Sequence, residues 1–172
     1  FRSWLPEGLY FYCSISIPFK DVFYPEIVRG DSLELFIDTR DIKTASYPTK
    51  FCHHFFFLPK EIQSIQAEEI TRFRNEDRHD LCDPSDLKVQ AQFQKEGYAM
   101  KIFIPSQSLY GYDPGECSRI GFSYRVNRTG GAPQNFCVSP EEFAIEQQPF
   151  LWGRVRLIDA NLSIRPTKGT PG

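Results

Sequence analysis

Cysteine and histidine side chains gather in two short stretches of the sequence. The first, KFCHHFFFLP, contains Cys52, His53 and His54, and the second runs from His79 to Cys82. Thiolate and imidazole groups are the ligands that zinc prefers, and a zinc site requires three or four of them that converge. These residue types therefore raise the question of a transition-metal centre.

The strand pattern around the paired histidines limits that interpretation. Residues Phe51 to Leu58 are predicted to form a β-strand, in which neighbouring side chains point to opposite faces. At most one of His53 and His54 can therefore join a loop ligand at one ion. The alternative is a partly buried, hydrogen-bonded histidine on each face of a central strand, with both faces largely apolar and covered.

Other chemistry is less well supported by the sequence. Met100 is the single methionine, and its alternation with Ile102 and Ile104 predicts a core residue rather than a haem ligand. Neither Cys52 nor Cys82 has a neighbourhood that marks an activated thiol. The sequence contains no glycine-rich phosphate loop, catalytic triad motif or dinucleotide fingerprint. These observations favour a protein that is not an enzyme, although two opposed carboxylates of a hydrolase remain an alternative.

Alternation of apolar and polar residues predicts about eight strands. The connection from Gln94 to Tyr98 has the composition of a hairpin turn. Pro59 to Glu68 and Ser139 to Gln147 are predicted to form single turns or short helices. The fold class is therefore all-β, an antiparallel two-sheet β-sandwich of jelly-roll type. The predicted strands are Leu9–Ile17, Ser32–Asp38, Phe51–Leu58, Glu69–Arg74, Leu87–Gln94, Tyr98–Ile104, Ile120–Asn127 and Arg154–Ile158.

Length and composition predict one domain. We expect a single β-sandwich over residues 1–159 and an extended tail or linker over 160–172, where apolar residues to bury are scarce. The net charge of −2 and the dispersed basic residues do not favour nucleic acid. No apolar run reaches the roughly 18 residues of a membrane span, so we expect a soluble chain. The five cysteines form no C-x-x-C pair, which favours free thiols in a reducing compartment such as the cytoplasm.

Three pieces of sequence, in order, resemble the family 9 carbohydrate-binding modules and the related β-sandwich sensor and cytochrome-type domains. The first is GLYFYCSISI followed by GDSLELFIDTRD, and the second is GYAMKIFIPSQSLYGYDPGE running into RIGFSYRVNRTGG. The third is FLWGRVRLI, which is similar to the closing glycine-led strand of that family. Together they cover roughly residues 8 to 159, and the resemblance implies a non-catalytic β-sandwich and favours a secreted protein.

The resemblance also implies where a sugar would bind. In sugar-binding members two aromatic side chains clamp the sugar, helped by a glutamate and an arginine on neighbouring strands. Glu34 matches the glutamate, whereas the two clamp positions fall near Val28 and Glu146 and the arginine position near Phe56. The aromatic clamp is therefore not matched, and a relocated platform would need residues such as Trp152. Structural calcium occurs in the family, and its candidate ligands here are Asp31, Asp38 and Asp41.

Three functions follow, in order of preference. The first is a non-catalytic binding module that holds a carbohydrate or another small ligand on the sheet face with Glu34, His54, Phe56 and Trp152. The second is a protein-interaction or structural domain in which apolar side chains fill the sugar face. The third is a metal-dependent or hydrolytic enzyme. The partner is accordingly a glycan or a protein.

Overall fold

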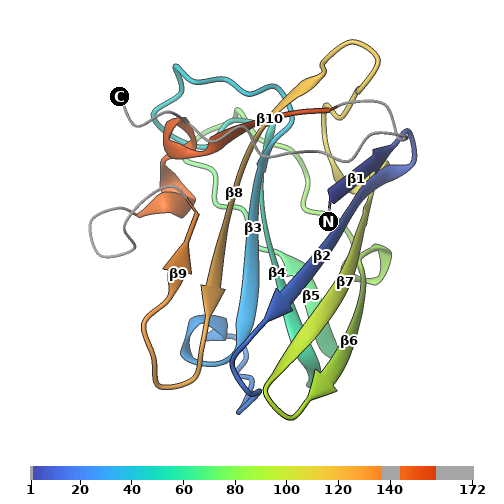
Figure 1. Ribbon diagram of the computed structural model, residues 1–172. Helices are drawn as coiled ribbons and strands as arrows, with labels where there is room; N and C mark the ends of the chain where they lie inside the picture. Colours follow the sequence, from blue (N-terminus) through green and yellow to red (C-terminus); the bar gives the residue numbers. More distant parts are fainter. Residues whose placement is uncertain (1, 137–143, 158–172) are drawn as a thin grey trace, which may run out of the picture.

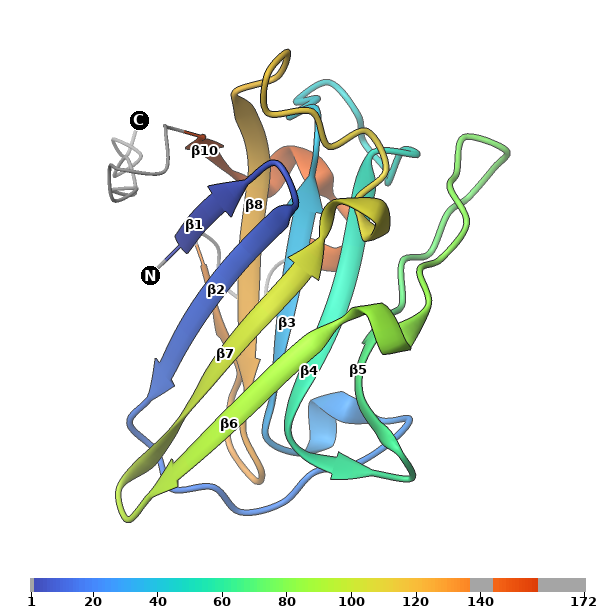
Figure 2. The same ribbon diagram turned by 90° about the vertical axis from the view of Figure 1, so that its right-hand side faces the viewer.

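Two antiparallel sheets pack face to face in the computed structural model, which describes residues 2–136 and 144–157 (Figures 1 and 2). In Figure 2 the four-stranded sheet, in the order β1-β2-β7-β6, lies in front of the second sheet. The second sheet has the order β10-β8-β3-β4-β5, and β9 pairs with β8. The predicted all-β sandwich is confirmed. The strands are β1 Arg2–Leu5, β2 Gly8–Ile15, β3 Ser32–Asp38, β4 Cys52–Ile62, β5 Ile65–Glu69, β6 Lys88–Gln94, β7 Gly97–Pro105, β8 Arg119–Asn127, β9 Gln134–Asn135 and β10 Gly153–Arg156.

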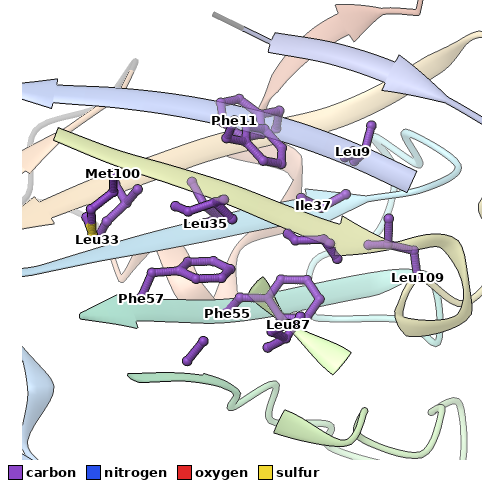
Figure 3. Packing of buried hydrophobic residues seen from close by; sticks show 14 of the residues in the cluster. Leu9, Phe11, Leu33, Leu35, Ile37, Phe55, Phe57, Leu87, Met100 and Leu109 are labelled. Atoms are coloured by element: carbon purple, nitrogen blue, oxygen red, sulfur yellow. The ribbon is translucent and has the colours of Figure 1, made fainter. Parts of the chain in front are cut away.

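The main core lies between the two sheets (Figure 3). Alternate residues of β3, including Leu33 and Leu35, meet Phe55 and Phe57 of β4, because the side chains of a strand alternate between its faces. Met100 of β7 packs in the same cluster and is fully buried, which confirms the predicted core role. Burial of this apolar surface is the main source of stability for the sandwich.

The opposite face of the six-stranded sheet is also covered. Every residue of β3 is buried, so both faces of that strand lie inside the protein. At one end Phe56 and Leu58 pack against Val22 and Ile27 from the β2–β3 connection. At the other end Phe36, Cys52, Ile145 and Trp152 form a third cluster. The prediction of a central strand covered on both faces is therefore confirmed for the KFCHHFFFLP stretch.

The predicted turn or short helix over Pro59 to Glu68 is wrong. Strand β4 continues through Pro59 to Ile62, and β5 follows after a tight turn in which Gln63 and Ser64 have positive φ. The register between β4 and β5 shifts in the interval from Phe57 to Ile62. An irregular ladder accommodates a proline because fewer backbone N–H groups are needed there.

The predicted strand over Glu69 to Arg74 is also misplaced, because β5 ends at Glu69. The residues after it run out along a long connection to the 3₁₀ turn η2, Pro84–Asp86, at the right of Figure 2. The side chains of Glu69 and Thr71 are hydrogen-bonded to each other. One backbone hydrogen bond, from the N–H of Ile70 to the carbonyl oxygen of His54, continues beyond β5, but residues 70–74 form no strand.

The predicted hairpin between β6 and β7 is confirmed. Gln94 pairs with Gly97, which leaves a two-residue turn. A Cβ atom on Gly97 would lie 2.1 Å from the carbonyl oxygen of Ile15, so only glycine allows this close approach. Part of the second predicted helical segment is a 3₁₀ turn, η4, Ile145–Gln147, which is followed by η5, Pro149–Leu151. The rest of that segment and the predicted tail over 160–172 lie outside the described residues.

The cysteines agree with the expectation of free thiols where they are described. Cys13, Cys52, Cys82 and Cys117 are unpaired, whereas Cys137 lies outside the described residues. Among the described residues, no helix has the length and apolar character that crossing a membrane requires.

Candidate functional site

A row of side chains crosses five strands on the outer face of the six-stranded sheet. Glu34 of β3 stands opposite Phe56 of β4 on one side and Arg125 of β8 on the other. The row continues to Glu68 of β5 and to Asn135 of β9. Because directly opposed residues in an antiparallel sheet share a face, these five side chains project from the same side.

Glu34 is held by three different side chains. Arg125 binds it with two groups, Nε at 2.5 Å from Oε2 and an NH2 nitrogen at 2.9 Å from Oε1. His54 Nε2 lies 2.8 Å from Oε1, and Asn127 Nδ2 donates to Oε2 at 2.9 Å. The carboxylate is 1% exposed. We call Glu34, His54, Arg125, Asn127 and Glu146 the Glu34 network, since Glu146 Oε2 accepts from Arg125 at 3.2 Å.

The charge of Glu34 is stabilised by these partners. Burial raises the pKa of a carboxyl group, but the hydrogen bonds from His54 and Arg125 outweigh burial and lower the pKa of Glu34 to about 2. The same carboxylate raises the pKa of Arg125, against the effect of burial. Glu34 therefore stays ionised near neutral pH and fixes the guanidinium of Arg125 in one plane.

Arg125 is the member of the Glu34 network that the sequence prediction missed. The resemblance placed the arginine near Phe56, but the structure supplies it from β8, on the other side of β3. The alternation of β8 puts Ser123, Arg125 and Asn127 on one face, and that signal was readable in the sequence. What the sequence lacked was the pairing of β3 with β8, which joins residues 91 positions apart.

The Glu34 network reaches the surface through its outer members. The side chains of His54, Arg125 and Glu146 are 10%, 15% and 32% exposed. Two further residues carry polar atoms without a partner in the described part of the chain: Asn135 is the cross-strand neighbour of Arg125, and Gln148 lies two residues after Glu146 in the sequence. Oδ1 and Nδ2 of Asn135 and Oε1 of Gln148 are buried without a hydrogen-bond partner among the described residues.

The predicted aromatic ligands lie beneath the surface. Phe56 is buried in the apolar cluster with Val22 and Leu58. Trp152 is 3% exposed, packs on Phe36 at 5.7 Å between ring centroids, and donates its indole N–H to the carbonyl oxygen of Ile145. Val28, near one clamp position of the resembled family, is exposed. The structure thus places Glu34 and His54 together, with Phe56 and Trp152 as packing residues on either side.

A second polar cluster lies on the inner face of β4. The side chains of His53, Glu69 and His79 offer ligand atoms within 4.8 Å of one another. His53 stacks on His79 at 4.3 Å between centroids, and His79 Nε2 lies 2.7 Å from Glu69 Oε2. As predicted, His53 and His54 point to opposite faces: His53 meets His79 from the connection after β5, and His54 meets Glu34 of β3.

Hydrogen bonds around His53 and His79 assign their protons. The backbone N–H of Tyr110 donates to Nε2 of His53, which therefore carries its proton on Nδ1. His79 contacts the carbonyl oxygen of Lys50 through Nδ1 and Glu69 through Nε2. Both partners of His79 accept, so both ring nitrogens donate. A metal would need lone pairs that these contacts already use, and the cluster fits a buried ion pair better than a metal site.

The protonation states agree with the environment. Burial lowers the pKa of His53 to about 4. Burial also lowers the pKa of His79, but its hydrogen bond to Glu69 outweighs burial and raises that pKa. The hydrogen bond from His79 likewise lowers the pKa of Glu69 against the effect of burial. Near neutral pH the cluster therefore contains a neutral His53 beside a His79–Glu69 ion pair.

The candidate cysteine nucleophiles are not activated. Burial, reinforced by the negative charge of Asp38, raises the pKa of Cys52 to about 12. Burial and the charge of Glu69 raise the pKa of Cys82 to about 12. Both thiols stay protonated near neutral pH, whereas a nucleophilic cysteine is a thiolate.

The three predicted calcium ligands do not fit a calcium ion. Asp31 accepts three backbone N–H groups, from Lys20, Asp21 and Thr129. Asp38 accepts two backbone N–H groups, and Asp41 pairs with Lys43 and Arg154. Donors and cations aimed at a carboxylate occupy the positions that an ion would take. These residues fix loops rather than form an oxygen cage.

Comparisons with known proteins address the fold. The sequence matches no family model and none of the curated proteins. Two solved structures of a family 9 carbohydrate-binding module from Caldicellulosiruptor kristjanssonii match 91% of the chain. The complex with cellotriose has a TM-score of 0.66 with 18% identity over 72% of its own chain. The complex with glucose has a TM-score of 0.69 with 17% identity over 74%.

The chain has the fold of family 9 carbohydrate-binding modules. The resemblance stated from the sequence is thereby confirmed for the fold. In this family 9 fold the Glu34 network lies on the outer face of the six-stranded sheet, and the His53 cluster lies on the inner face of the same sheet. The outer-face network is the better candidate for ligand binding, because its outer side chains reach the surface.

Proposed function

We propose that the protein is a non-catalytic carbohydrate-binding module whose ligand binds at the surface of the Glu34 network. The observation that carries this proposal is that both amide atoms of Asn135, the cross-strand neighbour of the fixed Arg125, are buried without a hydrogen-bond partner among the described residues. An unpaired buried polar group costs about 1–3 kcal/mol, so it calls for a partner from water or a ligand. Sugar hydroxyls both donate and accept, and can satisfy an amide on both of its atoms.

The solved structures with the same fold support this class of ligand, because they are carbohydrate-binding modules in complex with cellotriose and glucose. Within the Glu34 network the roles would be divided. Glu34 has four hydrogen-bond contacts and little exposed surface, so it orients Arg125 and His54 rather than contacting the sugar itself. Arg125, Glu146 and the two amides would make the contacts.

The chemistry of the network does not favour hydrolysis. A glycosidase requires one carboxylic acid that can protonate the leaving group, and such an acid has a raised pKa. Glu34 has its pKa lowered to about 2 and is held by a guanidinium. Its partner carboxylate, Glu146, binds the same guanidinium. Two carboxylates on one arginine do not oppose each other across a reacting bond.

The structure gives less support to a protein-binding role for this face. The apolar side chains that would form such a patch, Phe36, Phe56 and Trp152, are covered by residues of the chain itself. What remains near the surface is polar and charged, and suits a hydroxylated ligand better than an apolar one.

Calorimetric titration with glucose and cellotriose, followed by a glycan array, tests the proposal. Asn135→Ala removes the unpaired amide, so it should lower sugar affinity at least about tenfold while leaving the thermal midpoint unchanged or higher. Glu146→Gln should weaken binding with little effect on folding, because its side chain is partly exposed. Arg72→Gln, an exposed charge change in the connection after β5, is the matched control.

Binding that survives both site variants would place the sugar elsewhere and contradict the proposed site. If no arrayed glycan binds the wild-type protein, the carbohydrate function itself is wrong. Loss of stability in Asn135→Ala would show that its amide has a structural partner, and would remove the observation that carries the proposal.

A further inference from the structure

The outer face of the four-stranded sheet carries a row of exposed aromatic side chains. Tyr10 and Tyr12 project from β2 on the same side and are 38% and 46% exposed. Tyr10 stacks on Phe103 of β7 with ring centroids 4.5 Å apart and an interplanar angle of 27°. The side chains of alternate strand residues repeat about every 7 Å, so the aromatic groups form a short continuous platform. This face is turned toward the viewer in Figure 2.

Polar side chains extend the platform across the sheet. In the first row, Phe103 separates Tyr10 from Lys88 of β6, and in the second row Lys101 separates Tyr12 from Gln90. Long amine and amide groups beside aromatic rings can hydrogen-bond to hydroxyls that surround a stacked sugar ring. Aromatic faces flanked by such groups are typical of a carbohydrate-binding surface.

A groove runs over this platform. Its volume is about 1300 Å³, and its lining includes all six platform residues together with their core-facing neighbours Phe11, Val89 and Ile102. Glu61, Ser64 and Gln66 from the end of the β4–β5 hairpin and Asp83 near η2 also line it. Typical small-molecule pockets enclose about 300–1,000 Å³, so the size of this open groove fits an extended chain better than a single small molecule.

The charges of the groove indicate a neutral ligand. Among the described residues that line it, Lys88 and Lys101 balance Glu61 and Asp83. Asp83 is already oriented by hydrogen bonds from the backbone N–H and hydroxyl group of Ser85. A polyanion would be attracted by the lysines and repelled by the carboxylates. A polycation would be attracted by the carboxylates and repelled by the lysines. An uncharged hydroxylated polymer avoids both penalties.

We propose that this groove is a second glycan site, which binds a neutral polysaccharide chain by stacking on Tyr10 and Tyr12. Lys101 and Gln90 hydrogen-bond to its hydroxyl groups. The site lies on the opposite sheet from the Glu34 network, and its proposal does not depend on the function proposed for that network. The two sites would allow one domain to hold a short sugar at one face and a longer chain at the other.

Affinity gel electrophoresis tests this inference with two neutral polysaccharides, hydroxyethylcellulose and arabinoxylan, and with polygalacturonate as the charged comparison. At least one neutral polymer should retard the wild-type protein, with little dependence on NaCl concentration. Tyr12→Ala should weaken that binding on the order of tenfold, and Lys101→Gln should weaken it less, because stacking supplies more contact than one exposed hydrogen bond.

Matched controls separate this site from the Glu34 network. Tyr47→Ala removes an exposed tyrosine from another part of the surface, and Lys95→Gln neutralises an exposed lysine in the β6–β7 turn of the same sheet. Both controls should bind the neutral polymer like the wild type. Tyr10→Ala provides a second stacking variant, and thermal midpoints verify that each variant is folded.

Three results would overturn the inference. The first is retardation by a neutral polymer that Tyr10→Ala and Tyr12→Ala leave unchanged. The second is the absence of retardation by both neutral polymers, whether or not polygalacturonate binds. The third is self-association of the wild-type protein in sedimentation experiments, abolished by Tyr12→Ala, without polysaccharide binding. Loss of sugar binding in Asn135→Ala alone concerns only the Glu34 network.

Discussion

The backbone N–H of Tyr110 donates to Nε2 of His53 over 2.9 Å, and this bond fixes the tautomer of a fully buried histidine. The proton then sits on Nδ1, which has no hydrogen-bond partner among the described residues. A second proton would have to enter at Nε2 and break the bond from Tyr110. The environment therefore strongly favours the neutral ring, and folding becomes linked to pH.

The first prediction concerns this linkage at mildly acidic pH. The pKa of His53 is about 4 in the folded protein and 6.5 when unperturbed, so the unfolded state binds the proton more readily. The contribution of His53 to the free energy of unfolding is complete above pH 6.5 and is lost progressively as pH falls toward 4. Urea titrations across this range should show that the free energy of unfolding of His53→Gln depends less on pH than that of the wild type.

Glutamine serves as the replacement because its side-chain oxygen can still accept the Tyr110 N–H. Lys95→Gln, an exposed change, is the control and should follow the wild-type pH dependence. If the wild-type and His53→Gln curves run parallel from pH 6.5 to 4, His53 is not the buried neutral group described above.

The second prediction concerns His79, whose contribution to the free energy of unfolding changes with pH in the opposite direction. The pKa of His79 is raised in the folded protein, chiefly because its hydrogen bond to Glu69 outweighs burial. Its stabilising contribution is complete below the unperturbed value of 6.5 and is lost as pH rises through the raised pKa. The destabilisation caused by His79→Ala should thus be larger at pH 6 than at pH 9. Equal destabilisation at both values would show that the ring pairs with Glu69 in its neutral form.

The third prediction concerns the pair at the centre of the outer face. Glu34 and Arg125 are both largely buried and share two hydrogen bonds. Removal of one partner leaves the other charge buried without compensation, which typically costs about 3–5 kcal/mol. Glu34→Gln and Arg125→Gln should each lower the free energy of unfolding in urea by about this amount.

The double variant provides the decisive comparison for that pair. Since neither charge remains, its loss of stability should be clearly smaller than the sum of the two single losses. Simple additivity would show that the two side chains do not depend on each other.

Much of the sandwich was predictable because apolar and polar residues alternate along its strands. In β2, Leu9 and Phe11 face the core while Tyr10 and Tyr12 face outward, and alternation alone predicts that arrangement. The same signal failed around Pro59, where a buried strand tolerates a proline next to a register shift. A proline inside a strand resembles a turn until the ladder around it is known.

The candidate site was predictable only in part, for a different reason. Glu34 and His54 lie on neighbouring strands of a hairpin-like pair, and the sequence placed both near the ligand face. Arg125 comes from a strand far along the chain, and its contact with Glu34 depends on sheet order, which periodicity does not encode. His79 belongs to a long connection without periodicity, so its meeting with His53 could not be anticipated from pattern.

The last prediction concerns Trp152, which joins the segment of η4 and η5 to the outer face. Its indole packs on Phe36 and donates to the carbonyl oxygen of Ile145, one residue before Glu146. Trp152→Phe retains most of the packing and loses the hydrogen bond, so it should lower the free energy of unfolding by about 1 kcal/mol. Trp152→Ala also leaves a cavity and should lower it by about 3–5 kcal/mol.

These two variants also distinguish packing from ligand contact at Trp152. In Trp152→Phe the segment remains seated, so Glu146 keeps its place beside Arg125 and affinity for a sugar at the Glu34 network should change little. In Trp152→Ala the segment loses its anchor, and sugar affinity should fall together with stability. Calorimetric titration of both variants measures this, and urea unfolding gives their stabilities. A large loss of sugar affinity in Trp152→Phe at nearly unchanged stability would instead make the indole itself a ligand contact.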